Sequence, residues 1–189
     1  TLIRRIEEPD RLLLEENIDT LNTFASGVDV PVLFGLIPSA ASVWQDRLPV
    51  GAPTADEKDW IDEITERMTI PTIDLNAALT HHSQEAIYYR TDHHWTSLGA
   101  FYGANAIFEA AELEPLRLSD YQRQTVSENF RGTNESSACA WWTEPDAIEV
   151  YVKEDGKTVT SNFTGREEPG QLYAAERLDT KNQYAYFLG

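Results

Sequence analysis

The sequence has a single cysteine, Cys139, so no intrachain disulfide can form and no CxxC zinc or redox motif exists. This fits a reducing compartment, and it also fits exported domains that carry no disulfides. An apolar run of about 18 residues is also lacking, so membrane insertion by this chain is not expected. Because the first residue is Thr1 and not an initiator methionine, the sequence is expected to be a piece of a longer chain.

Basic residues are scarce, with 15 Lys and Arg against 32 Asp and Glu, which gives a formal net charge of -17. A surface of this sign repels phosphate backbones and anionic lipid headgroups, so nucleic-acid binding is not expected. Uncharged small molecules, glycans, cations and basic partners remain open, and no cofactor is predicted. The oligomeric state is left open.

What the sequence does contain is the composition of a globular protein, with 41% hydrophobic and 25% charged residues in 189 positions. This length predicts one domain, 1–189. In its first portion, 1–113, helical patterns alternate with short apolar runs, an order of elements that is typical of a parallel α/β sheet. Helices are expected over 7–26, 54–68, 76–83 and 96–112, and buried strands over 28–38 and 70–75.

The portion 114–189 changes to turns and alternating segments, and is predicted to be a β-rich elaboration of the same domain. Extended segments are expected over 147–152, 171–178 and 184–188. No internal repeat or linker separates this portion from the first one.

Most of the candidate chemistry lies in the stretch 88–100, which contains Asp92 and His94. Two residues apart in an extended segment, these side chains point to the same side. Asp92 can then orient the imidazole of His94, which moves protons near neutral pH. The alternative is a histidine that a carboxylate satisfies structurally, without any chemistry.

No nucleophile stands out, because no GxSxG elbow surrounds any serine. Ser39 and Ser42 follow the apolar run 28–38, where ligands of open α/β sheets bind, but serine is also common at such turns. Ser136 and Ser137 are the remaining candidates.

Three further groups allow more than one interpretation. Imidazole and carboxylate side chains suit a transition metal, although adjacent histidines do not easily chelate one ion. These metal candidates are His81, His82, Asp92, His93 and His94. Trp141 and Trp142 can stack on sugar faces, but residues this large predict that at least one is in the core. Cys139, in an alanine-rich context, is expected to be a buried, unreactive thiol.

The stretch 88–100, YYRTDHHWTSLGA, resembles the signature of the DHHW protein family. The resemblance extends over 30–41, 48–49, 130–133 and 145–148 and therefore covers most of the chain. The Asp-x-His-Trp motif with the following Thr96 and Gly99-Ala100 is also similar to that of the alginate O-acetyltransferases and related SGNH-hydrolase-like polysaccharide acetylation proteins.

This resemblance implies an SGNH-hydrolase-like, three-layer α/β/α fold with a mostly parallel sheet, in which Asp92 and His94 are the catalytic acid and base. It also implies that the nucleophilic serine follows 184–189 and lies downstream of this chain, which alone is then expected to be inactive. Backbone amides near Ser39 and Ala40 are candidates for an oxyanion site, and Arg90 and Trp95 for the substrate neighbourhood.

The function expected from these residues is O-acyl transfer to glycans, or hydrolysis from them, by an exported bacterial protein whose substrate is an acylated glycan or a small acyl ester. A non-catalytic surface or glycan-binding module is the first alternative, and a His/Asp metal-binding protein is the second.

Overall fold

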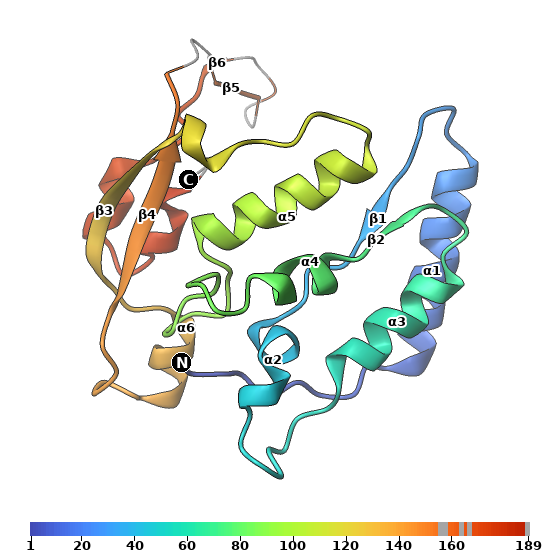
Figure 1. Ribbon diagram of the computed structural model, residues 1–189, viewed down its shortest axis with the longest axis horizontal. Helices are drawn as coiled ribbons and strands as arrows, with labels where there is room; N and C mark the ends of the chain where they lie inside the picture. The colour runs from blue at the N-terminus through green and yellow to red at the C-terminus, as the bar shows by residue number, and fades with distance from the viewer. Residues whose placement is uncertain (155–158, 163–164, 166–167, 188–189) are drawn as a thin grey trace. The chain divides into compact units, whose positions relative to one another are not determined.

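The computed structural model describes residues 1–154, 159–162, 165 and 168–187 (Figure 1). The chain divides into two compact units, which are treated separately below. The N-terminal unit comprises 3–88 and 93–116, and the C-terminal unit comprises 1–2, 89–92 and the chain from 117 onward.

The N-terminal unit contains five α-helices, one 3₁₀ helix and two very short strands. These are α1 (Arg11–Ser26), β1 (Phe34–Gly35), α2 (Ala40–Val43), η1 (Gln45–Arg47), α3 (Glu57–Arg67), β2 (Thr72–Ile73), α4 (Leu75–His81) and α5 (Ser97–Ala110). Each longer helix begins at a residue whose side chain accepts a backbone N–H: Asp10 for α1, Asp56 for α3 and Thr96 for α5.

The four helices predicted in this portion are therefore found, with small differences at their ends. The predicted start of the second helix at Thr54 is wrong, because Asp56 caps α3 while the Thr54 hydroxyl accepts the Ile6 N–H. α1 begins after Pro9 at Arg11, four residues later than predicted.

The predicted strands 28–38 and 70–75 contain β1 and β2, which pair in parallel over two residues each, Phe34 opposite Thr72 and Gly35 opposite Ile73. Pro31 and Pro71 have no N–H to contribute to a ladder, and the Phe34 N–H donates to the Pro71 carbonyl at 3.0 Å. Among the described residues this pair is the only parallel one, so a mostly parallel, three-layer sheet is not seen.

The core of the N-terminal unit lies between α2, α4 and the segment that precedes α5. Its buried members are Ala40, Val43, Trp44, Leu79, Ile87 and Tyr88, and partly buried Trp95, Leu98 and Tyr102 pack against them. Glycines of α5 allow close contact here. A Cβ at Gly103 would lie 2.7 Å from the Trp95 ring, and one at Gly99 would overlap the Ile87 carbonyl oxygen.

The C-terminal unit contains a long antiparallel pair, β3 (Gln122–Phe130) and β4 (Asp146–Val152), which run side by side in Figure 1. Its other elements are η2 (Leu118–Asp120), α6 (Thr133–Ala138), β5 (Thr160–Ser161), β6 (Glu168–Pro169), η3 (Ala175–Asp179) and η4 (Gln183–Tyr186). Its core is formed by Tyr89, Phe130, Ile148, Val150 and Tyr186.

The portion 114–189 is therefore not made of strands alone. The strand predicted at 147–152 is β4. The extended segments predicted at 171–178 and 184–188 are confirmed only at Tyr173 and Phe187, which form an isolated antiparallel bridge, while η3 and η4 are found in much of the rest of their described part. Aromatic residues gave those segments their strand-like pattern. Here they pack as a cluster instead, with the Tyr173 and Tyr186 rings stacked at 5.0 Å.

Candidate active site

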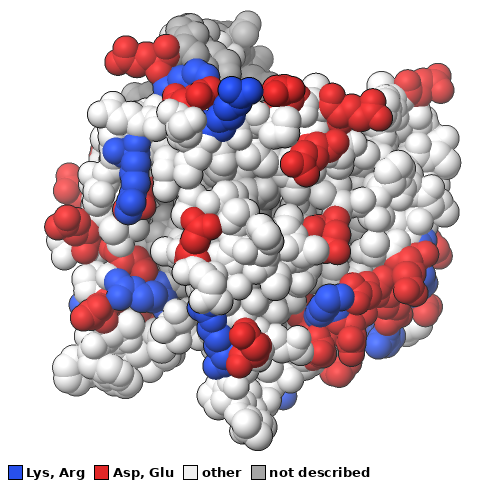
Figure 2. Space-filling view, in the orientation of Figure 1, with Lys and Arg blue, Asp and Glu red and all other residues white. Residues whose placement is uncertain are grey.

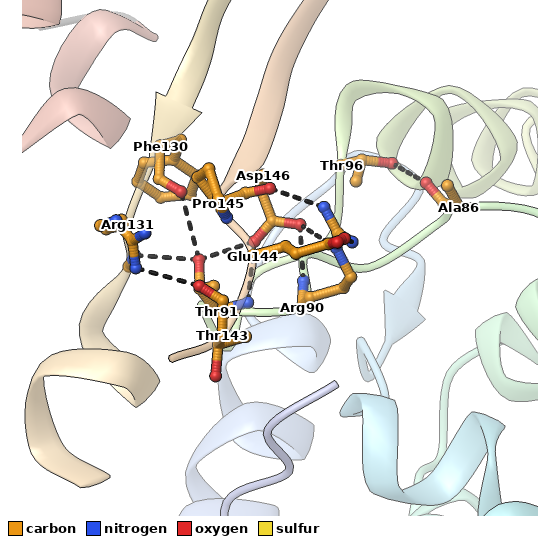
Figure 3. Close-up of polar contacts among 11 residues, drawn as sticks. Ala86, Arg90, Thr91, Thr96, Phe130, Arg131, Thr143, Glu144, Pro145 and Asp146 are labelled. Carbon is orange, nitrogen blue, oxygen red and sulfur yellow. Dashed lines mark hydrogen bonds and ion pairs between the residues drawn. The ribbon is translucent and has the colours of Figure 1, made fainter. Parts of the chain in front are cut away.

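Asp92 lies at the end of the segment 89–92 of the C-terminal unit, in which Arg90 is exposed but Thr91 is fully buried and Asp92 is 3% exposed. Asp146, the first residue of β4, fixes this segment (Figure 3). Its Oδ1 accepts the Arg90 N–H at 2.9 Å, and its Oδ2 accepts the Thr91 N–H at 2.8 Å and the Thr91 hydroxyl at 2.6 Å. One buried carboxylate therefore sets the backbone that leads directly into Asp92.

The start of α6 holds the same segment from a second side. The Gly132 N–H donates to the Thr91 hydroxyl oxygen at 3.0 Å, and the Glu135 N–H donates to the Thr91 carbonyl at 3.0 Å. Asp92 itself accepts two hydrogen bonds on Oδ2, from the Thr133 N–H at 2.7 Å and from the Thr133 hydroxyl at 3.0 Å. These donors fix the orientation of the carboxylate.

Gly132 allows this close approach. A Cβ at this position would lie 2.7 Å from the Asp92 Cα and would overlap the Asp92 side chain. The Asp92 carboxylate therefore packs directly against the backbone at the start of α6.

The side chain of Arg90, a residue predicted in the substrate neighbourhood, binds the loop before β4 (Figure 3). Its guanidinium donates to the Pro145 carbonyl at 2.6 Å and pairs with Glu144 at 3.0 Å and Asp146 at 3.3 Å. These contacts are structural. A contact of Arg90 with substrate stays a prediction.

In the N-terminal unit, the residues after Asp92 are fixed by the start of α5. Trp95 forms an antiparallel bridge with Tyr88, and the Thr96 hydroxyl donates to the Ala86 carbonyl at 2.7 Å, the contact drawn in Figure 3. His94, partly buried, immediately precedes this anchored segment, and its ring lies 3.9 Å from that of His93, centroid to centroid.

Ser39 and Ala40 lie at the start of α2, in the same unit. The Ser39 N–H and hydroxyl both donate to Glu57 Oε2, at 3.0 Å and 2.6 Å, and the Ala41 N–H donates to the Ser39 hydroxyl oxygen at 3.2 Å. These bonds serve the helix start and its contact with α3. The oxyanion role of this turn stays a prediction.

His81, the last residue of α4, and His82, which follows it, have local partners, and their rings contact each other edge to face with centroids 5.0 Å apart. His82 Nδ1 lies 2.7 Å from Glu85 Oε1, and its ring stacks on Tyr102 at 3.4 Å between centroids. Hydrogen bonding to His82, and secondly to Tyr102, lowers the pKa of Glu85. The interaction gives His82 a structural role. The metal site predicted from His81, His82, Asp92, His93 and His94 stays an untested alternative.

Sequence reasoning missed Asp146, Thr133 and Gly132. Gly132-Thr133 and Pro145-Asp146 belong to the stretches that carry the family resemblance, but no pattern in the sequence indicates their contacts with Thr91 and Asp92. Two expectations about the neighbouring loop are wrong: Cys139 is exposed, and Trp141 and Trp142 are both exposed, at 77% and 70%.

Within the described part of the chain, no helix has both the length and the apolar character needed to cross a bilayer.

The family comparison assigns this chain to the SGNH-hydrolase-like class of α/β folds. The model of the family described as SGNH hydrolase-like domain, acetyltransferase AlgX, matches residues 19–138, and the chain belongs to this family. No curated protein matches the sequence.

Solved structures include similar folds. A DHHW family protein from Eubacterium siraeum DSM 15702 is 27% identical, with a TM-score of 0.76 over 99% of this chain, which confirms the resemblance to that family. The O-acetyltransferase domain of Pseudomonas putida AlgJ has a TM-score of 0.60 at 17% identity over 78% of this chain. Bacillus cereus PatB1 has a TM-score of 0.74 at 17% identity, over 98% of this chain and 69% of its own.

The chain spans 63% of the length of the DHHW family protein and 60% of that of the AlgJ domain. The likeness to AlgJ and PatB1 concerns the fold.

Proposed function

We propose that this chain is part of an acyltransferase or esterase of the SGNH-hydrolase type, in which Asp92 orients His94 and His94 is the general base. The observation that carries the proposal is the Asp92 carboxylate, buried and held by two donors of Thr133 in the Asp-x-His-Trp motif of an acetyltransferase family. A carboxylate fixed in this way is suited to hold an imidazole in one orientation.

The proposed chemistry has two steps. His94 removes the proton of a serine hydroxyl as its oxygen attacks the acyl carbonyl of the donor ester, and the protonated imidazole then gives this proton to the departing alkoxide. A glycan hydroxyl, or water, attacks the acyl-serine in the second step. His94 accepts its proton and returns it to the serine oxygen. The serine is expected downstream of residues 184–189, and backbone amides stabilise the oxyanion.

The remaining sequence expectations belong to the same proposal. The β1–β2 pair would be part of a larger, mostly parallel sheet between two helical layers, and 1–113 and 114–189 would be portions of one incomplete domain. The substrate would be an acylated glycan or a small acyl ester, and the protein would be exported.

The test is acetyl-ester hydrolysis and acetyl transfer to oligosaccharides by the protein in its full natural length. His94→Ala should lower kcat about 10²–10⁴-fold, the range of general base catalysis. Asp92→Asn should lower kcat by up to about 10⁴-fold, since the ring loses its orienting carboxylate. His81→Ala, on the exposed end of α4, is the matched control and should keep wild-type rates.

Full activity of His94→Ala would overturn the proposed base. A folded protein that is inactive on all acylated glycans and esters would favour the non-catalytic glycan-binding module. A bound transition metal, found by elemental analysis after purification without chelator and lost in His94→Ala, would favour the metal site.

A further inference from the structure

The tryptophan pair Trp141–Trp142 is an exposed aromatic surface that the proposed chemistry does not use. The two indoles are 77% and 70% exposed and contact each other edge to face, with centroids 5.7 Å apart and planes 81° apart. Burial of apolar surface stabilises a protein or a complex by about 25 cal/mol for each Å². A large side chain such as tryptophan, left exposed, therefore forgoes a large stabilisation. Two adjacent exposed tryptophans therefore offer a partner considerable apolar surface.

These residues occupy the two central positions of a tight turn. The Thr143 N–H donates to the Ala140 carbonyl at 2.9 Å, which closes the turn around Trp141 and Trp142. Such positions favour glycine, proline, asparagine and aspartate, so local turn preference does not account for tryptophan at either position. Residues that break a local preference without a gain in packing are expected at functional sites.

The turn is also held firmly at its base, on both sides. Ala140 is 1% exposed and its N–H donates to the Glu135 carbonyl at 3.2 Å. Arg131 donates to the Thr143 carbonyl at 3.1 Å and pairs with Glu135 at 2.7 Å. An aromatic surface fixed before binding loses less conformational entropy when a ligand arrives.

Charge narrows the class of ligand. Nucleic acids, whose bases can stack on indoles, and anionic lipid surfaces both carry phosphate groups, which a chain of net charge -17 repels. Glu144, two residues after Trp142, is 84% exposed and adds a local carboxylate that disfavours acidic sugars, although Arg90 pairs with it. An uncharged pyranose ring, whose axial C–H groups form an apolar face, satisfies both conditions.

We propose that Trp141 and Trp142 form a binding platform for uncharged pyranose rings of a glycan. Because the indole planes are nearly perpendicular, one stacks on the face of a sugar ring while the other contacts the edge of that ring or the next sugar. The platform follows α6, whose first turn holds Asp92, in the same unit. The choice of a glycan rests on the proposed function.

The platform is tested by binding and not by turnover. The protein in its full natural length, labelled at the indole nitrogens, is titrated by NMR with cellotetraose and chitotetraose, and with tetramannuronate as an anionic probe. The uncharged probes should shift the Trp141 and Trp142 indole signals with a Kd on the order of 1 mM, about -4 kcal/mol. Trp141→Ala and Trp142→Ala should each weaken binding roughly tenfold, which corresponds to about 1.4 kcal/mol.

Two controls separate the platform from folding and from chemistry. Leu172→Ala, at an exposed apolar residue of the same unit, should leave the Kd unchanged. His94→Ala should lower the rate of acyl transfer about 10²–10⁴-fold and keep glycan binding. Failure of the platform is therefore distinguishable from failure of the proposed function.

Three outcomes would overturn the platform. The first is no shift of either indole signal at about 10 mM of either uncharged probe, a concentration well above a millimolar Kd. The others are tighter binding of tetramannuronate than of both uncharged probes, and binding that survives both alanine substitutions. Self-association that buries the two indoles, detected by sedimentation and lost in both variants, would assign the surface to a protein partner instead.

Discussion

At the scale of single residues, the neighbouring buried tyrosines Tyr88 and Tyr89 differ in whether their hydroxyls are hydrogen-bonded. The Tyr88 hydroxyl donates to the Pro38 carbonyl at 2.6 Å within the N-terminal unit. The Tyr89 hydroxyl, in the C-terminal unit, is buried without a hydrogen-bond partner among the described residues. Burial raises the pKa of both phenols well above the ordinary range, so both stay neutral until strongly alkaline pH.

Removing these two hydroxyls should therefore have different effects on stability. Tyr88→Phe leaves the buried Pro38 carbonyl without its donor and should lower the free energy of unfolding by about 1–3 kcal/mol. Tyr89→Phe removes an unsatisfied buried hydroxyl and should leave stability unchanged or raise it by up to about 1 kcal/mol. Urea unfolding of both variants measures the difference. A larger loss in Tyr89→Phe than in Tyr88→Phe would contradict these hydrogen-bond assignments.

At the scale of elements, α6 is the helix that matters most for the candidate site and, like α2, it was not predicted from the sequence. Its residues, TNESSA, have modest helix propensity and no apolar stripe. Hydrogen bonds from Gly132, Thr133 and Glu135 to Thr91 and Asp92 hold it in place. The helix is thus a product of tertiary contacts, and the same contacts position Asp92, the carboxylate proposed to orient His94.

A methyl group at the start of α6 should disturb both the helix and the position of Asp92. Gly132→Ala forces the backbone and the Asp92 side chain apart, and should cost about 1–3 kcal/mol of stability, the usual range for overpacking. Gly27→Ala, where the nearest atom would be an ordinary 3.5 Å away, is the matched control and should change stability by less than about 0.5 kcal/mol. Thermal unfolding compares the two variants, and equal stability would mean that Asp92 does not rest on Gly132.

At the scale of the whole molecule, the charge of -17 sets how stability responds to salt. On the face drawn in Figure 2, acidic side chains gather over α1 and α3. Some are paired, such as Glu63 with Arg11 at 2.5 Å and Asp62 with Lys58 at 2.5 Å, but these pairs are exposed and contribute little. Repulsion among the unmatched carboxylates should dominate.

Salt should therefore stabilise the protein at neutral pH. Raising sodium chloride from about 0.01 M to 0.5 M shortens the Debye length from about 30 Å to a few Å. A gain near 1 kcal/mol corresponds to a rise in Tm of about 2–4 °C for a chain of this size. Glu66→Lys, on the exposed face of α3, should raise the Tm at low salt and reduce the salt response. A Tm that falls with salt would show that the ion pairs outweigh the repulsion.

The sequence by itself determined what depends on local pattern and composition. Helical periodicity predicts α1, α3 and α5, Thr96 predicts the start of α5, and the stretch 88–100 indicates the family. Net charge, too, follows from composition alone. These features need no knowledge of which distant residues meet.

The tertiary structure decided which polar groups are paired and which apolar groups are left in water. Thr91 meets Asp146 across 55 residues and Asp92 meets Thr133 across 41, and no period in the sequence marks partners at such separations. The exposure of Trp141 and Trp142 is decided in the same way, because a turn closed by hydrogen bonds turns both indoles outward. Size and hydrophobicity favour a buried position for tryptophan, but only the tertiary structure shows whether a given tryptophan is buried or exposed.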